Sequence, residues 1–159
     1  MKARTAMSPL PILEHADADA LADAVATVLA EAIRQGVAER GEAWLALAGG
    51  GTPFAAYRRL AAMDLPWANV HLVASDERVV PAGHGKRNER ALAEAFAPAA
   101  GVTIHPLVAA DGTATLSTAT AALAPLGHRA FDAVLLGMGN DAHFASLFPR
   151  ITPASALDA

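Results

Sequence analysis

The stretch Trp44-Leu45-Ala46-Leu47-Ala48-Gly49-Gly50-Gly51-Thr52-Pro53 carries the pattern that decides the fold. Its first residues form a short apolar run, which is typical of a buried strand. The glycines allow a sharp turn and a close approach of the backbone to a ligand. Thr52 is a natural N-cap and Pro53 a natural first residue of a following helix. This order of strand, turn and helix predicts one unit of a parallel sheet.

The same alternation extends in both directions from this stretch. A helix is predicted before it, with Asp17 or Asp19 as its N-cap and Gly36 or Gly41 at its end. The apolar face of this helix consists of Leu21, Val25, Val28, Leu29, Ile33 and Val37. Further strands are predicted at residues 70–73, 104–108 and 131–136, and helices at 54–60, 88–96 and 113–123.

Two features of these elements predict their places in the sheet. Apolar strands that alternate with helices indicate a parallel sheet covered on both faces. Pro106 interrupts the weakest strand, so we expect that strand at an edge. The run Phe131-Asp132-Ala133-Val134-Leu135-Leu136 is the clearest strand pattern in the chain.

Composition limits the classes of protein to consider. The 159 residues include 12 Lys and Arg against 16 Asp and Glu, which gives a formal net charge of −4. This acidic balance argues against nucleic-acid binding through a basic face. Hydrophobic residues make up 53% and charged residues 18%, which excludes global disorder and fits one globular domain.

Cysteine is absent, which excludes a disulfide framework, a thiolate zinc site and a cysteine nucleophile. A chain without cysteine suits a reducing compartment, so we expect a cytoplasmic location. Pro9 and Pro11 interrupt the N-terminal region, and we therefore expect no signal peptide. No run approaches the roughly 18 apolar residues of a membrane span, so no membrane partner is expected.

In parallel sheets, ligands bind outside the carboxyl ends of the strands. Three clusters follow predicted strands. The first is the glycine turn, where Gly49, Gly50, Gly51 and Thr52 precede a helix N-terminus that suits an anion such as phosphate. A tight turn with a capped helix and no ligand is the alternative.

The second cluster is Asp76-Glu77-Arg78, and three charges at the end of a buried strand must be solvated, paired or used. Arg78 could clamp a phosphate or carboxylate, and Asp76 could accept hydrogen bonds from sugar hydroxyls. A surface ion-pair cluster is the alternative. Asn88 opens a later predicted helix, where it is either a simple N-cap or a ligand contact.

The third cluster is Gly137-Met138-Gly139-Asn140-Asp141-Ala142-His143. His143 could act as a general base near neutral pH, with Asp141 orienting its ring, and a helix could begin near His143. A histidine that caps a turn is the alternative. The remaining histidines show no paired metal-ligand spacing, and Trp44 and Tyr57 are interpreted as packing residues. These histidines are His15, His71, His84, His105 and His128.

Taken together, the clusters resemble the motifs of the 6-phosphogluconolactonase family. The resemblance runs in order through Ala48-Gly49-Gly50-Gly51-Thr52-Pro53, Leu65-Pro66-Trp67, Asp76-Glu77-Arg78 with Val80-Pro81, Asn88, and Leu135-Leu136-Gly137-Met138-Gly139-Asn140-Asp141-Ala142-His143-Phe144-Ala145-Ser146-Leu147-Phe148-Pro149. It implies an α/β, Rossmann-like three-layer sandwich with a parallel sheet. It also implies hydrolysis of 6-phosphogluconolactone to 6-phosphogluconate in the pentose phosphate pathway.

The resemblance implies a role for each site residue. His143 would be the general base that activates water, Asp141 would support it, and Arg78 would bind the phosphate or stabilise developing negative charge. Residues 49–52 would cradle the phosphate and Asp76 would position sugar hydroxyls, with Asn88 as a further substrate contact. The implied partner is a small sugar-phosphate lactone, with no metal and no redox or organic cofactor; the oligomeric state stays open.

The chain departs from the family pattern at a few positions. Gly51 stands where the family usually has Ser, Ala142 where it usually has Gly, and Phe144 where Thr is common. Ala142 would be strained if its φ is positive. Family members continue past the last motif, so we expect residues 1–159 to form a single lactonase-like domain that lacks its C-terminal portion.

Two alternatives remain beside lactone hydrolysis. The first is a catalytically impaired, truncated remnant that binds sugar phosphates. The second is an enzyme like glucosamine-6-phosphate deaminase or isomerase, whose pattern Asn140, Asp141 and His143 would also fit.

Overall fold

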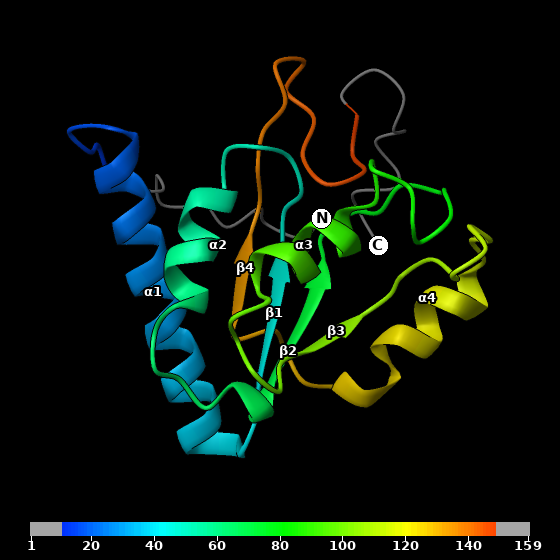
Figure 1. Ribbon diagram of the computed structural model, residues 1–159, viewed down its shortest axis with the longest axis horizontal. Coiled ribbons are helices and arrows are strands. Elements are labelled where there is room, and N and C mark those ends of the chain that lie inside the picture. Colours follow the sequence, from blue (N-terminus) through cyan, green and yellow to red (C-terminus); the bar gives the residue numbers. More distant parts are fainter. Residues whose placement is uncertain (1–10, 149–159) are drawn as a thin grey trace, which may run out of the picture.

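The protein folds around one four-stranded parallel sheet (Figure 1). The structure, a computed structural model, describes residues 11–148. The N-terminal residues on which the signal-peptide expectation rests, apart from Pro11, lie outside that range, as does Pro149 of the last motif. The helices are α1 (Ala18–Arg40), α2 (Phe54–Ala61), α3 (Asn88–Ala95) and α4 (Leu116–Leu123), with 3₁₀ turns η1 (Trp67–Asn69) and η2 (Ala124–Leu126); the strands are β1 (Ala43–Leu47), β2 (Val70–Ala74), β3 (Thr103–His105) and β4 (Ala133–Leu135).

The strands lie in the order β3-β2-β1-β4, and every pairing is parallel. Leu45 in the middle of β1 pairs with Leu72 of β2 on one side and with Ala133 of β4 on the other. The predicted parallel sheet is therefore confirmed, as is the edge position of β3 next to Pro106. All carboxyl ends of the strands consequently face the same side of the molecule.

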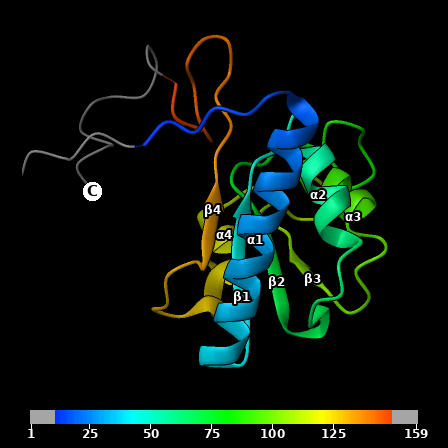
Figure 2. The ribbon, with the colours of Figure 1, turned by 90° about the vertical axis from the view of Figure 1, so that its left-hand side faces the viewer.

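The helices cover the two faces of this sheet unequally. Helices α1, α2 and α3 lie on one face and α4 lies on the other (Figure 2). Right-handed crossovers explain the places of α2, α3 and α4, because β1, β2 and β3 advance across the sheet in one direction and the connection to β4 returns in the other. The α/β sandwich has three layers, as predicted, but within residues 11–148 a single helix, α4, covers the second face.

Strand β4 is shorter than its sequence pattern predicts. It spans Ala133–Leu135 at the edge of the sheet, and the side chains of Val134 and Leu136 are about half exposed. The prediction of a strand over 131–136 was therefore too long. An apolar run indicates burial, but no helix of the described residues covers Val134 and Leu136 on the second face.

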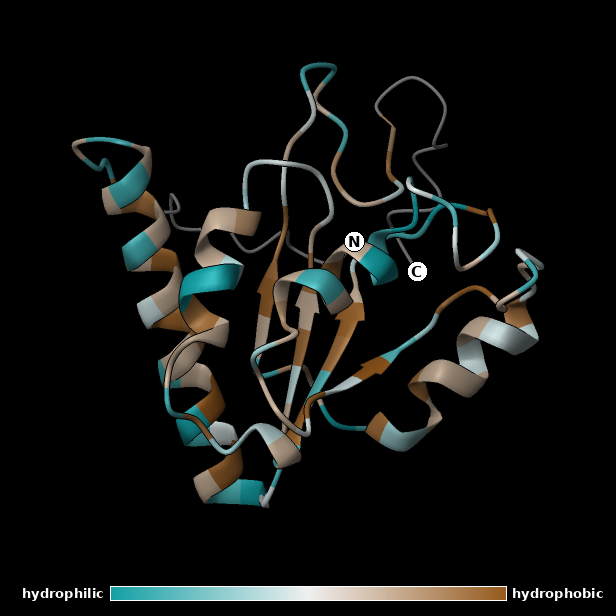
Figure 3. Ribbon diagram, viewed as in Figure 1, coloured by the Kyte–Doolittle hydropathy of each residue, from teal (hydrophilic) through white to brown (hydrophobic). Residues whose placement is uncertain are grey.

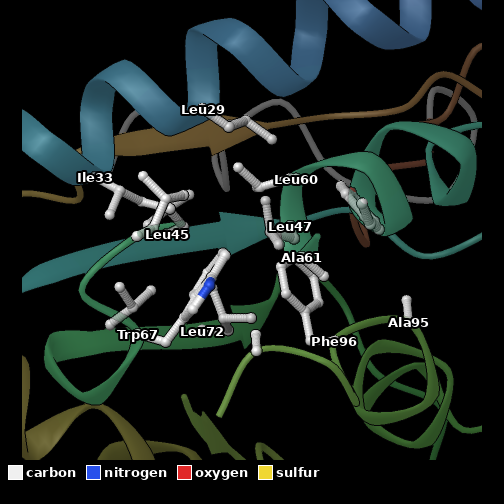
Figure 4. Close-up of a cluster of buried hydrophobic side chains, with 14 of the residues drawn as sticks. Leu29, Ile33, Leu45, Leu47, Leu60, Ala61, Trp67, Leu72, Ala95 and Phe96 are labelled. Atoms are coloured by element: carbon white, nitrogen blue, oxygen red, sulfur yellow. The ribbon is translucent and has the colours of Figure 1, made fainter. Parts of the chain in front are cut away.

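The core lies between β1, β2 and the three helices of the first face. Leu29 and Ile33 of α1 meet Leu45 and Leu47 of β1, and Leu60 of α2 packs beside them (Figure 4). These five side chains are 0–3% exposed. Val28 is 65% exposed, so its assignment to the apolar face was wrong. In Figure 3 the strands are mostly brown (apolar), whereas α1 alternates between brown and teal, as expected of a helix with one buried face and one exposed face.

The helix ends test the predicted caps. Asp17 caps α1 by accepting a hydrogen bond of 2.7 Å from the backbone N–H of Ala20, and Gly41 ends the helix with φ 82°. Thr52 does not cap α2, because that helix begins at Phe54 after Pro53 and has no side-chain cap. Helix α4 begins at Leu116 with Thr115 as its cap, three residues later than predicted.

A cluster of rings lies on the second face of the sheet. The buried indole of Trp44 stacks on the imidazoles of His71 and His105, with ring centroids 4.5 Å apart in both pairs. Nδ1 of His71 lies 3.0 Å from Nε2 of His105, and the carboxylate of Glu42 lies 3.5 Å from Nε2 of His71. Burial and then the neighbouring His71 lower the pKa of His105.

The lowered pKa of His105 predicts a loss of stability in mild acid. The unfolded chain takes up this proton near pH 6.5, whereas the folded protein resists it. The free energy of unfolding in urea should therefore hold steady above about pH 7 and fall as the pH drops below about 6.5. His105→Gln should flatten this dependence, while His15→Gln, at an exposed position before α1, should leave it unchanged. If the free energy of unfolding fell equally steeply with decreasing pH in the wild type and in His105→Gln, His105 would not be the cause of this dependence.

Candidate functional site

A cavity of about 590 Å³ opens at the carboxyl ends of the strands. In Figure 1 the arrowheads of β1 and β2 point toward the loops that form it. Its walls come from the glycine turn after β1, the segment after β2 and the loop after β4. The cavity brings together every predicted site residue except Asp141, which contacts His143 from outside the wall; the residues on the wall are Gly49, Gly50, Gly51, Thr52, Asp76, Arg78, Asn88 and His143.

The glycine turn fits closely against the neighbouring helix α3. A Cβ at Gly49 would lie 2.3–2.6 Å from atoms of the Asn88 side chain, so only glycine allows this contact. Gly50 has φ 85°, a conformation that favours glycine. A Cβ at Gly51 would meet nothing within 4 Å, so that position could carry a side chain. The turn and the first residues of α2 line the cavity. Unpaired backbone N–H groups at a helix N-terminus can bind an anion.

The charges after β2 point to different places. Arg78 is 57% exposed at the cavity, and its Nε lies 3.7 Å from Oδ2 of Asp76. Glu77 is buried instead, with its side chain 2% exposed. The alternative interpretation of this cluster as a surface ion-pair cluster is therefore wrong for Glu77. Arg78 retains donors that can bind an anion in the cavity.

Asn88 is the first residue of α3 rather than its N-cap. Its side-chain amide donates a hydrogen bond of 2.9 Å to the backbone oxygen of Asp76. Its backbone N–H donates to the carboxylate of Glu77 at 2.8 Å, so Glu77 takes over the capping role. The Asn88 side chain is thereby fixed between the glycine turn and the end of β2.

The loop after β4 holds the histidine. Nδ1 of His143 lies 2.5 Å from Oδ1 of Asp141, which leaves Nε2 as the ring nitrogen that can exchange a proton with a ligand. A Cβ at Gly139 would lie 2.3 Å from the His143 ring and 2.7 Å from Asp141, so this glycine makes room for the pair. The imidazole also stacks on Phe148, with ring centroids 4.8 Å apart.

The segment after His143 is a tight turn rather than the predicted helix. The backbone groups of Phe144 and Leu147 exchange hydrogen bonds of 3.3 and 2.9 Å, and Ala145 between them has φ 47°. Ala142 has φ 63°, which confirms the strain expected at this position. A positive φ costs a residue with a Cβ on the order of 1 kcal/mol.

The hydrogen bond with His143 lowers the pKa of Asp141. Asp141 therefore stays ionised at neutral pH and well into the acid range, where its negative charge can orient the imidazole and stabilise a protonated ring. The arrangement can take a proton from a water molecule in the cavity and return it later.

The described part of the chain holds neither a cluster of metal-ligating side chains nor a membrane-spanning helix. Between residues 11 and 148, no group of three or more His, Asp or Glu side chains is arranged to hold a metal ion. Over the same residues, no helix is long and apolar enough to cross a membrane.

For three residues near the site, sequence reasoning assigned no role of their own, although Glu77 and Gly139 belong to the predicted clusters. Glu77 and Arg87 form a buried ion pair behind the cavity, with Nε of Arg87 3.4 Å from Oε2 of Glu77. Gly139 makes room for His143 and Asp141. The signal for the ion pair was a run of charges directly after a buried strand, which required partners that sequence spacing alone does not identify.

Comparisons with known proteins show which family the chain matches. The sequence model of the family described as glucosamine-6-phosphate isomerases/6-phosphogluconolactonase matches residues 16–156. A 6-phosphogluconolactonase of Synechocystis is 41% identical over 77% of this chain and 55% of the relative, and one of Rhizobium meliloti is 43% identical over 83% and 56%. The crystal structure of a 6-phosphogluconolactonase from Shewanella baltica superposes with a TM-score of 0.71 at 30% identity, over 84% of this chain and 58% of that one. The chain thus spans little more than half the length of these relatives.

The positive φ of Ala142 predicts that glycine is favoured there. Ala142→Gly should raise the free energy of unfolding by up to about 1 kcal/mol, because the gain from relieved strain exceeds the added entropy of the unfolded chain. Ala38→Gly, at an exposed position within α1, should instead lower it by about 1 kcal/mol. Urea unfolding measures both. If Ala142→Gly lowered the free energy of unfolding as much as Ala38→Gly does, the φ of Ala142 would carry no strain.

Proposed function

The chain belongs to the family of glucosamine-6-phosphate isomerases and 6-phosphogluconolactonases, and from this premise we propose that its cavity hydrolyses 6-phosphogluconolactone to 6-phosphogluconate. One observation carries the proposal. The Asp141–His143 pair, the glycine turn and Arg78 meet at one cavity, so a base and groups that bind anions lie on the walls of the same space.

The chemistry needs few groups, because a lactone carbonyl is already reactive. Nε2 of His143 takes a proton from a water molecule as the water oxygen attacks the carbonyl carbon. The tetrahedral intermediate collapses, the bond between the carbonyl carbon and the ring oxygen breaks, and the ring oxygen receives a proton. Asp141 stabilises the imidazolium that forms between these two steps. No nucleophilic side chain is required.

The phosphate is proposed to bind at the glycine turn. The N-terminus of α2 and the backbone N–H groups of residues 49–52 favour an anion, and the hydroxyl of Thr52, free of a capping role, adds a donor. Arg78 contributes a positive charge to the phosphate or to the developing oxyanion. Asp76 and Asn88 are proposed to contact the sugar hydroxyls.

The proposal also covers the domain, the metabolic pathway and the cellular location. Residues 1–159 are proposed to act as one lactonase-like domain in the pentose phosphate pathway of the cytoplasm, which fits the cysteine-free sequence. The curated relatives at 41% and 43% identity carry the lactonase name, which supports hydrolysis over deamination. An impaired, sugar-phosphate-binding remnant stays the second candidate because Ala142, next to the proposed base, has a strained φ of 63°.

The test follows acid release from freshly prepared 6-phosphogluconolactone, corrected for spontaneous hydrolysis. The chain should accelerate release, and His143→Asn should lower kcat by roughly 10²–10⁴-fold because the proton acceptor is lost. His128→Asn, at an exposed position after η2, is the matched control and should leave the rate unchanged. Binding of 6-phosphogluconate without any rate enhancement would favour the remnant, and a fully active His143→Asn variant would exclude the proposed base.

The open space beside Gly51 leads to a second prediction, which concerns phosphate binding. Gly51→Ser fits without a clash and adds a hydroxyl donor to the proposed phosphate cradle, so affinity for 6-phosphogluconate should rise several-fold. Isothermal titration calorimetry measures it, with Gly83→Ser in the exposed loop after β2 as the control. Weaker binding by Gly51→Ser than by the wild type would place the phosphate elsewhere.

A further inference from the structure

A buried ion pair lies directly behind the cavity wall. The side chain of Glu77 is 2% exposed and that of Arg87 is 1% exposed. Burying two charged groups is costly unless hydrogen bonds satisfy them, so their partners show what the pair holds in place.

The carboxylate of Glu77 binds three backbone N–H groups. Its Oε1 accepts from Arg78 at 2.7 Å and from Asn88 at 2.8 Å, and its Oε2 accepts from Glu89 at 2.7 Å. Arg78 and Asn88 both lie on the cavity wall, on segments that are separated by the loop of residues 79–87. A single carboxylate therefore links the backbone positions of two proposed substrate contacts.

The guanidinium of Arg87 fixes this carboxylate against a further segment. It donates to the backbone oxygens of Val80 at 2.7 Å, Ala109 at 3.3 Å and Val108. It also pairs with Glu89 at 2.9 Å. Arg87 thereby joins the loop after β2, the first turn of α3 and the segment after β3 into one rigid support.

We infer that Glu77 is a positioning residue, which sets the places of Arg78 and Asn88 in the cavity and is itself held by Arg87. This inference rests on the proposed function, because it assigns the positioned residues to binding of the sugar phosphate. Hydrogen bonds to an ionised group are the strong ones, and a displacement of about 1 Å in a binding group can cost up to about a hundredfold. Glu77 itself lies behind the wall and does not touch the ligand.

A second buried carboxylate, Asp132, serves as a control. It distinguishes a loss of positioning in the cavity from a general loss of stability. Asp132 precedes β4 with its side chain 7% exposed, pairs with Arg40, and accepts a hydrogen bond of 2.7 Å from the backbone N–H of Trp44. Like Glu77, it is a buried carboxylate that pairs with an arginine and accepts from a backbone N–H group. It lies beside the first residues of β1, at the end of the sheet away from the cavity.

The experiment compares Glu77→Gln with Asp132→Asn in the full chain. Both variants should melt at a lower temperature than the wild type. Isothermal titration with 6-phosphogluconate, at a temperature where both are folded, should show a Kd raised roughly tenfold or more for Glu77→Gln and within about twofold of wild type for Asp132→Asn. Equal affinities for the two variants would overturn the inference. A wild-type chain that does not bind 6-phosphogluconate would instead overturn the proposed function on which it rests.

Amide exchange in the wild type tests the same point if Glu77→Gln does not fold. Saturating 6-phosphogluconate should slow exchange of the Arg78 and Asn88 amides, which Glu77 binds, and leave the Trp44 amide, which Asp132 binds, unchanged. The same exchange rates for Arg78 and Asn88 with and without the ligand would overturn the inference.

Discussion

The parallel pairing of β1 with β2 on one side and β4 on the other is the constraint on which the rest of the structure depends. All five residues of β1 are buried, so this strand must lie inside the sheet. Parallel pairing then brings the ends of β1, β2 and β4 to one edge. The glycine turn, Arg78 and His143 follow these three ends, which is why segments almost a hundred residues apart share one cavity.

Charged groups that the fold buries are placed where they connect segments. Glu77 and Arg87 join the loop after β2, α3 and the segment after β3, whereas Asp132 and Arg40 join β4, β1 and the end of α1. Each pair satisfies backbone groups that no strand or helix could satisfy, which offsets the cost of burying the charges. The pairs act at opposite ends of the sheet, and the site depends on the first of them.

Much of the fold follows from local patterns, and the exceptions have physical reasons. The alternation of apolar runs and helical periods predicts the parallel sheet, and the ends of the strands predict the site, including the contact of Asp141 with His143. The exposure of β4 could not be predicted, because it depends on which helices cover the second face. The role of Glu77 could not be predicted either, since its partners other than the neighbouring Arg78 N–H lie 10 to 12 residues away and are brought to it only by folding.

The central claim is that the strand ends form one sugar-phosphate site. It is tested most directly by a ¹⁵N NMR titration of the chain with 6-phosphogluconate. The account predicts that the shifted amides cluster in residues 49–52, at Arg78 and Asn88, and in residues 137–143, with those of the Trp44–His71–His105 cluster unaffected. Shifts confined to another surface, or absent at saturating ligand, would contradict it.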